Sequence, residues 1–375
     1  MRMRAGVLLV LLACLAAAAF AARVRYEMAD FEVYWTTGRR ASAAEPLYRT
    51  TDGHYQFKYF PAFAFVFAPV AALPLPMAKA VWFLASVAAL MGLLGLSVRA
   101  LPARAVPSYL IVTATMLTLA KFYAHELTLG QVNLLLGIVV MGALVQLQRG
   151  RETAAGAAFG AAAIVKPYAL LFLPYLLATK RFRAAAAAVI VAAAALLLPA
   201  LQYGVQGNAD LLSLWWQTVW ESTPALLTNP DNVSIAGMYA KWVGPGFTAD
   251  RLTVATNLLL LGFTSWVISR RRFSYDPEYL DVALLLIVAV LISPQRWDYV
   301  LLLSPPAIML IVNALPRPGR GLQVTTVACL AVIGLLIYDV LGRTLYSRFR
   351  ALSVITVVYC VLIGVLAYLR VRRIA

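Results

Sequence analysis

Apolar runs of about one membrane span recur along almost the whole chain and are separated by short clusters of Lys and Arg. A helix needs about 20 mainly apolar residues to cross a bilayer, and short cytoplasmic loops carry the excess of basic residues. With every basic cluster placed on one side, this pattern predicts an all-α polytopic membrane protein whose two termini are both cytoplasmic. The twelve predicted spans lie near residues 5–22, 78–98, 105–120, 128–147, 153–165, 167–178, 183–201, 252–269, 279–294, 298–315, 321–340 and 352–369.

Two apolar segments do not fit a simple crossing. The run 60–76 contains several prolines, and a span there would move Arg99 and Arg104 to the outer side, so we predict a helix lying in the outer interface. The run 153–178 is too long for one ordinary span and starts and ends near basic residues. It therefore predicts two short helices that meet near Lys166, because the proline that follows disfavours a continuous helix.

The longest segments outside the predicted spans are the outer loops 23–77 and 202–251. The second contains three tryptophans and is expected to include an amphipathic interfacial helix. Residues 1–22 either stay as an anchor or are cleaved as a signal peptide, and both alternatives place the start of the first loop outside. Nothing in the sequence marks a domain boundary, so a single transmembrane domain over 1–375 is expected.

Composition and charge narrow the classes of function. The 375 residues are 62% hydrophobic and 13% charged, which excludes an ordinary soluble globule. The net charge of +16 is explained by basic residues on the cytoplasmic side, so no nucleic acid partner is implied. The three cysteines lie in apolar runs without metal-ligand spacing, and two histidines are too few for a His-rich redox site. The sequence therefore calls for neither a metal nor another cofactor.

Polar side chains inside or next to the spans gather on the outer side, together with most of the carboxylates. Ionisable groups at membrane depth are costly and usually line a cavity or a pathway. We therefore predict one outward-facing polar cavity, floored by helix ends and roofed by the loops 23–77 and 202–251. The candidate residues are Asp30, Tyr34, His125, Glu126, Gln131, Asn133, Lys166, Asn232, Arg296, Trp297 and Asp298.

Six segments resemble, in order, the motifs of glycosyltransferase family 87, a branch of the C-type glycosyltransferase superfamily. This family includes polyprenyl-phosphate-mannose-dependent alpha-mannosyltransferases that elongate phosphatidylinositol mannosides. The resemblance implies the C-type fold, interfacial helices in the first outer loop, and an active site on the extracytoplasmic side of the cell membrane. The six segments are residues 29–48, 55–82, 127–137, 160–177, 229–237 and 291–306.

The resemblance also implies roles for particular residues. Asp30, which precedes Val33 and Tyr34, matches the family's catalytic aspartate and would be the general base. Lys166 matches a family lysine that precedes a proline-containing stretch. Gly130, Gln131 and Asn133 match a Gly-Gln-x-Asn motif, and Asn232 stands in a motif where Val233 replaces the glutamine of the family.

A further departure lies in residues 293–299, which read Ser-Pro-Gln-Arg-Trp-Asp-Tyr. The mannosyltransferases have one or two histidines after a similar segment, whereas this chain has Arg296 and Asp298. The sequence therefore leaves the sugar and the acceptor open.

The residue types fit sugar transfer from a lipid carrier. A polyprenyl-phosphate sugar stays in the bilayer and needs no nucleotide site, so its phosphate would meet the cations Lys166 and Arg296. One base acting on the acceptor hydroxyl of a lipid or glycan inverts the anomeric carbon, whereas retention would use a second carboxylate. The expected partners are therefore the lipid-linked donor, the acceptor and the membrane lipids.

Other interpretations of the same residues stay open. Lys166 and Arg296 are also explained as helix-end cations, Gln131 and Asn133 as hydrogen bonds between helices, and Trp297 as an interface anchor. A transporter or flippase of a lipid-linked sugar would use a similar cavity, but it predicts inverted repeats and charges that reach both faces. The sequence shows neither, since the inner halves of the spans are nearly free of ionisable residues. A structural scaffold would not need so many polar groups at one face.

Overall fold

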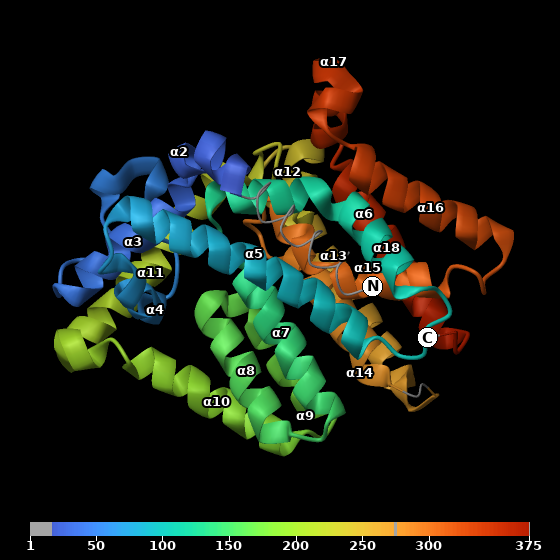
Figure 1. Cartoon of the computed structure of the whole chain (residues 1–375), viewed down its shortest axis with the longest axis horizontal. Coiled ribbons are helices and arrows are strands. Elements are labelled where there is room, and N and C mark those ends of the chain that lie inside the picture. Colours follow the sequence, from blue (N-terminus) through green and yellow to red (C-terminus); the bar gives the residue numbers. More distant parts are fainter. Residues whose placement is uncertain (1–16, 274–275, 375) are drawn as a thin grey trace.

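The computed structural model describes residues 17–273 and 276–374, and within these residues the fold is all helical (Figure 1). An isolated antiparallel bridge joins Asn232 to Trp297. The expected first span, residues 5–22, and Cys14 lie largely or wholly outside the described part. The elements are η1 (Phe20–Val24), α2 (Arg25–Glu27), α3 (Ala29–Ser42), η2 (Thr50–Tyr55), α4 (Pro61–Ala71), α5 (Leu75–Ala100), α6 (Ser108–Leu129), α7 (Asn133–Gln148), α8 (Glu152–Val165), η3 (Pro167–Leu171), α9 (Phe172–Ala178), α10 (Phe182–Leu197), α11 (Ala200–Leu227), α12 (Ile235–Val243), α13 (Phe247–Ser269), η4 (Arg270–Phe273), α14 (Pro277–Ile292), η5 (Asp298–Leu303), α15 (Pro305–Ala314), α16 (Arg320–Leu335), α17 (Tyr338–Ala351) and α18 (Val354–Val371).

Within the described residues, three helices are each long and apolar enough to cross a membrane: α5, α13 and α18. Three bent pairs, α6 with α7, α10 with α11, and α16 with α17, raise the number to six if each pair is one span. The chain is therefore a polytopic membrane protein. Twelve crossings stay a prediction, because several of the predicted spans are short or broken helices such as α8, α9 and α15.

The breaks in the helices have identifiable causes. The axes of α6 and α7 differ by 118°, because Gly130 caps α6 in the left-handed conformation at φ 69°. A side chain at Gly130 would also come within 2.7 Å of Phe31 Cβ. The predicted break near Lys166 is confirmed: α8 ends at Val165, and Lys166 is extended ahead of Pro167.

The segment 298–315 is a correction to the sequence-based expectation. We expected one helix there, but the chain forms the short 3₁₀ helix η5 and then α15, which begins at Pro305. Two consecutive prolines follow Ser304, and neither can donate the backbone hydrogen bond that would continue η5 into α15.

The first outer loop folds into α3, η2 and α4, and α3 packs lengthwise on α4. Gly38 of α3 permits this approach, since a Cβ there would lie 3.0 Å from the backbone of Phe67. In Figure 1, α3, α4 and α11 gather at one end of the molecule, away from the C-terminus. The helix predicted within 60–76 is thus present as α4. The helix predicted within 202–251 is present as the part of α11 that follows residue 201.

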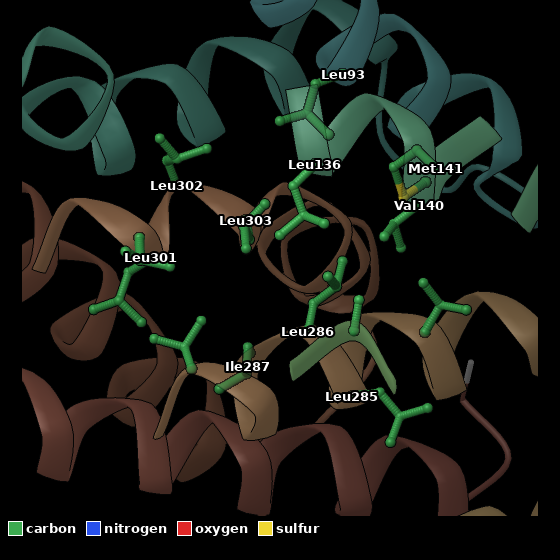
Figure 2. Close-up of a cluster of buried hydrophobic side chains, with 14 of the residues drawn as sticks. Leu93, Leu136, Val140, Met141, Leu285, Leu286, Ile287, Leu301, Leu302 and Leu303 are labelled. Carbon is green, nitrogen blue, oxygen red and sulfur yellow. The ribbon is translucent and has the colours of Figure 1, made fainter. Parts of the chain in front are cut away.

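The core is an apolar centre around α14, whose residues from Glu278 to Leu291 are all buried. Leucines and other apolar side chains of α5, α7 and η5 pack against it (Figure 2). A helix that is hydrophobic all round is typical of the middle of a bundle rather than its surface. Because η5 follows the loop 293–297, this core also fixes the position of that loop.

A network of buried ion pairs lies near the C-terminus, at the start of α14. Arg370, fully buried in α18, pairs with the buried Asp281 at 2.6 Å. Arg271 and Arg181 bind Glu278 at 2.8 and 2.9 Å. The inner halves of the spans were expected to be nearly free of ionisable residues, and Asp281, inside the predicted span 279–294, is an exception whose charge is matched by Arg370 and Arg271 close in space.

We expect Arg370→Leu to destabilise the protein, because it leaves the Asp281 carboxylate buried without its closest cation. Removing one member of a buried pair costs about 3–5 kcal/mol, whereas removing both is much less harmful. Thermal unfolding of the purified protein should therefore show a large loss for Arg370→Leu and a partial recovery for Arg370→Leu with Asp281→Leu. The exposed Arg372→Leu is the matched control. Equal unfolding temperatures for Arg370→Leu and the control would show that the pair does not stabilise the fold.

Candidate active site

A cavity of about 380 Å³ lies between the first outer loop, α11 and the loop that precedes η5. Its wall combines one carboxylate, three cations, several tyrosines and an apolar strip from α11. The residues that line it are Asp30, Val33, Tyr34, Tyr55, Gln56, Lys58, Tyr59, Gln131, Lys166, Pro167, Tyr168, Trp215, Val219, Thr223, Leu226, Ser293, Pro294, Gln295, Arg296, Trp297, Tyr299 and Val300.

Three acidic residues stand close together at the start of α3, and the structure separates their roles. Asp30 lines the cavity, where its Oδ2 accepts a hydrogen bond of 2.6 Å from Gln131 Nε2. Glu27 instead pairs with Arg23 at 2.7 Å, and Glu32 pairs with Lys79 at 2.6 Å. Because α2 ends before Met28 and α3 starts after it, Glu27 and Asp30 are not on one continuous helix.

Gln131 is oriented by two tyrosines. Its Oε1 accepts hydrogen bonds from the hydroxyls of Tyr34 and Tyr59, at 2.9 and 3.0 Å. A carboxylate only accepts, whereas a tyrosine hydroxyl can also donate, so the NH₂ group of Gln131 faces Asp30 and its oxygen faces the tyrosines. The two hydroxyls also lie 2.7 Å apart, which keeps Tyr34 and Tyr59 in one hydrogen-bonded group.

Lys166 joins this group from the junction of α8 and η3. Its ammonium donates a hydrogen bond of 2.7 Å to the hydroxyl of Tyr59. Burial, reinforced by the nearby Arg296 cation, lowers the pKa of Lys166 to about 7. Burial also lowers the pKa of Lys58, which lines the same cavity. An anionic ligand next to Lys166 would stabilise the protonated, positively charged form of its side chain.

Arg296 is the third cation of the cavity. Its guanidinium lies over the ring of Tyr168, 4.3 Å from the ring centroid, and Nη1 donates to the carbonyl of Gln295 at 2.6 Å. Burial lowers the pKa of Arg296, although an arginine still keeps its charge at neutral pH. Within the described residues, its buried Nε has no hydrogen-bond partner. The cavity therefore places a partly desolvated guanidinium next to Lys166.

Asn232 supports the loop that contains Arg296 through hydrogen bonds to its backbone. Its Nδ2 donates to the carbonyl of Pro294 at 2.9 Å, and the next backbone N–H, of Val233, donates to the carbonyl of Arg296 at 2.8 Å. Gly237 makes room for this side chain, since a Cβ there would lie 2.6 Å from Asn232 Cγ. Asn232 therefore positions the loop and does not line the cavity.

Glu126 and Asn133 are fully buried at the bend between α6 and α7. The Glu126 carboxylate accepts from the backbone N–H groups of Asn133 and Leu134, at 2.6 and 3.1 Å, and from Asn133 Nδ2 at 2.8 Å. These bonds satisfy the first N–H groups of α7, which have no partner inside the helix. The pair thus caps α7 and fixes the start of this helix, two positions after Gln131.

The last two candidates, His125 and Asp298, lie on the other side of the loop from the cavity. His125 Nδ1 is 3.6 Å from Asp298 Oδ1, and the imidazole packs edge-on against the Tyr299 ring. The structure thus brings six of the predicted residues together on the cavity and places five behind its wall. The six are Asp30, Tyr34, Gln131, Lys166, Arg296 and Trp297, and the five are His125, Glu126, Asn133, Asn232 and Asp298.

The sequence matches the model of Glycosyltransferase family 87 over residues 57–294, which is more than half of the chain. The chain belongs to glycosyltransferase family 87. It is therefore a membrane glycosyltransferase that uses a sugar donor and an acceptor. No curated protein and no solved structure matches it.

The family 87 match and the cavity overlap without coinciding. Tyr59, Gln131 and Lys166 fall inside the matched residues, whereas Asp30 and Arg296 fall outside them. The family match thus includes the centre of the hydrogen-bonded group. Asp30 is connected to this group by its hydrogen bond with Gln131, and Arg296 lines the same cavity as Lys166.

Sequence reasoning missed several polar residues of this family 87 cavity, among them Lys58, Tyr59 and Tyr168. Lys58 and Tyr59 come shortly before the proline that starts α4, and Tyr168 follows the Lys166-Pro167 break. The sequence signal that could have identified them is a tyrosine near a lysine at the boundary of a helix. Their convergence depends on contacts such as Lys166 to Tyr59, which spans 107 positions in the sequence.

Among the described residues, no group of three or more His, Cys, Asp and Glu side chains converges in the way that a metal ion requires. Asp30 is also the only carboxylate among the described residues that line the cavity. The chemistry that this family 87 cavity offers is one base or acceptor beside several cations.

Proposed function

We propose that this glycosyltransferase moves a hexose, mannose in the first instance, from a polyprenyl-phosphate donor to a hydroxyl of a glycolipid or glycan. The observation that supports this function best is the single carboxylate of Asp30 in a cavity that also holds Lys58, Lys166 and Arg296. In this proposal the reaction inverts the anomeric carbon and takes place on the extracytoplasmic face of the cell membrane.

The cations suit the phosphate of the donor. When the bond between sugar and phosphate breaks, negative charge develops on the leaving phosphate, and fixed cations in a partly desolvated cavity stabilise that charge. Arg296 can present its guanidinium edge to two phosphate oxygens, while Lys166 acts as a point charge beside it. The apolar strip of Trp215, Val219 and Leu226 gives the same cavity a wall suited to a lipid carrier.

Asp30 suits the role of general base. The acceptor hydroxyl must lose a proton as it attacks the anomeric carbon, and a carboxylate within hydrogen-bond reach can take it. Gln131 donates to Oδ2 of Asp30 and so fixes how this carboxylate faces the cavity, where the acceptor hydroxyl would meet it. Among the described residues that line the cavity Asp30 is the single carboxylate, which supports direct displacement with inversion.

The extracytoplasmic orientation rests on charge. In the twelve-span arrangement the loops at the far side from the cavity carry the basic clusters, including Arg149 with Arg151 and Arg270 to Arg272. Basic loops stay in the cytoplasm, so the cavity faces outward. A transporter or flippase remains the alternative function, and the buried charges at the start of α14 are a feature it could use. Those charges are paired with one another, however, and do not line the cavity.

Transfer should proceed from a polyprenyl-phosphate mannose labelled in the sugar and should fail with the nucleotide sugar alone. Asp30→Asn keeps the shape and hydrogen bonding of the side chain but removes its basicity. We expect it to lower kcat by about 10²–10⁴, the range attributed to general acid–base catalysis, with little change in donor binding. Product formation by the purified protein in nanodiscs measures this.

Glu45→Gln is the matched control, because Glu45 belongs to the same outer loop but pairs with Arg49 outside the cavity. It should keep nearly full transfer. An Asp30→Asn variant as active as Glu45→Gln would show that the base has been assigned to the wrong carboxylate. Movement of the lipid-linked sugar across the membrane without transfer would favour the flippase.

The pKa of about 7 for Lys166 predicts a pH-dependent donor KM. Below pH 7 the ammonium is protonated and attracts the phosphate, and above pH 7 the neutral amine does not. Between pH 6 and pH 8 the protonated fraction falls about tenfold, so donor KM should rise by up to that factor. Lys166→Arg keeps its charge over this range and should flatten the profile. An unchanged profile in Lys166→Arg would mean that another group causes the dependence.

Orientation is tested by labelling. Thr51 in η2 and Arg151 between α7 and α8 are both exposed and belong to opposite sides of the proposed arrangement. In a background without native cysteines, Thr51→Cys should react with a membrane-impermeant maleimide added to intact cells, and Arg151→Cys should react only after permeabilisation. The reverse pattern would place the cavity on the cytoplasmic side.

A further inference from the structure

A second hollow, of about 450 Å³, lies along the neighbouring side of α3. We call it the outer groove. It shares Val33 and Tyr55 with the active-site cavity, so these two side chains form the boundary between the two spaces. The residues of the outer groove are Tyr26, Glu27, Ala29, Glu32, Val33, Thr36, Thr37, Arg40, Asp52 and Tyr55.

The outer groove is built on one stripe of α3 and covered on one side by η2. Positions 29, 33, 36 and 40 recur at the spacing of one helical face. Arg40 on this face binds both carboxylate oxygens of Asp52 in η2, at 2.5 and 2.9 Å. The Arg40 guanidinium holds the pKa of Asp52 below its usual range, so the clamp persists at neutral pH. The groove is therefore held in shape without a ligand.

The chemistry of the outer groove differs from that of the active-site cavity. The cavity offers Lys58, Lys166 and Arg296 to an anion, whereas the groove offers the carboxylates of Glu27 and Glu32. The side chains of Glu27 and Glu32 are 39% and 47% exposed, although each is paired with a cation. A carboxylate has about four acceptor positions, so each retains capacity to accept hydrogen bonds from ligand hydroxyls.

Two tyrosines flank the same groove with much of their surface exposed. Tyr26 is 69% exposed, and Tyr55, on the boundary with the cavity, is 55% exposed. An aromatic ring combines a flat apolar face with a polar hydroxyl, which suits a ligand that has both C–H and O–H groups on its surface. Thr36 adds a further hydroxyl between them. Carboxylates, hydroxyls and aromatic faces together suit a polyhydroxylated ring.

We propose that the outer groove binds the carbohydrate part of the acceptor and presents one hydroxyl past Val33 and Tyr55 to Asp30. This inference rests on the proposed transfer function and names the side from which the acceptor reaches the base. The two carboxylates disfavour the phosphate of the donor in the groove, and the three cations favour it in the cavity. The two substrates then approach Asp30 from separate spaces, one lined by three cations and the other by carboxylates that are paired with cations.

Binding of simple sugars to the purified protein in nanodiscs tests the assignment without requiring transfer. The probes are the methyl α-glycosides of mannose, glucose and galactose, and the readout is saturation-transfer difference NMR. At least one should bind the wild-type protein. Thr36→Trp places a bulky ring in the groove and should abolish binding, and Tyr26→Ala should weaken it at least about threefold through loss of an aromatic face. Thr344→Trp, on an exposed position of α17, is the matched control.

The outcomes separate the groove from the transfer function. Absence of binding to the wild-type protein, or equal binding to wild type, Thr36→Trp and Tyr26→Ala, would overturn the groove assignment whatever the transfer assay gives. Loss of binding in both groove variants, with the control unchanged, supports it. Thermal unfolding checks that each variant is folded, and Tyr26→Ala, an exposed truncation, keeps the test decisive if Thr36→Trp does not fold. Failure of lipid-linked transfer by a wild-type protein that binds sugar in the groove would count against the proposed donor, not against the groove.

Discussion

The side-chain amide of Gln131 is the interaction on which the rest of the site depends. Its oxygen accepts from Tyr34 and Tyr59, its nitrogen donates to Asp30, and Tyr59 in turn accepts from Lys166. A glutamine has one acceptor side and one donor side, so the tyrosines and the carboxylate can be satisfied together in one orientation of the amide only. The amide of Gln131 therefore sets the direction of the Asp30 carboxylate on α3. Through Tyr59 it also links Asp30 to the Lys166 ammonium, which directly follows α8.

The amide can do this because the backbone around it is constrained on both sides. Gly130, which precedes it, adopts a left-handed conformation and lets α3 approach closely. Asn133, which follows two positions later, begins α7 under the cap supplied by Glu126. Several polar residues that line no cavity thus have a defined role, since buried polar groups that are fully hydrogen-bonded fix one geometry.

Local sequence signals predicted some of these features and could not predict others. The break at Lys166, the helices within both long outer loops and the distinction of Asp30 from Glu32 follow from proline, apolar pattern and motif position. The capping role of Glu126, the support of the Arg296 loop by Asn232 and the central place of Tyr59 depend on contacts between distant segments. A sequence displays polar residues near one face but not whether each points into the cavity or into the wall behind it. Family membership narrowed the chemistry, and only the fold separated residues that line the cavity from residues that hold it.

The buried pair of Asp281 and Arg370 has a consequence for the order in which the protein matures. The two residues are 89 positions apart, and Arg370 lies almost at the end of the chain. During synthesis Asp281 is therefore made long before its closest cation, with Arg271 as the nearby charge already present. An unpaired carboxylate is poorly tolerated in an apolar core. The packing of α14 at this end can be completed only when α18 has been made, so a helix synthesised much later closes this part of the bundle.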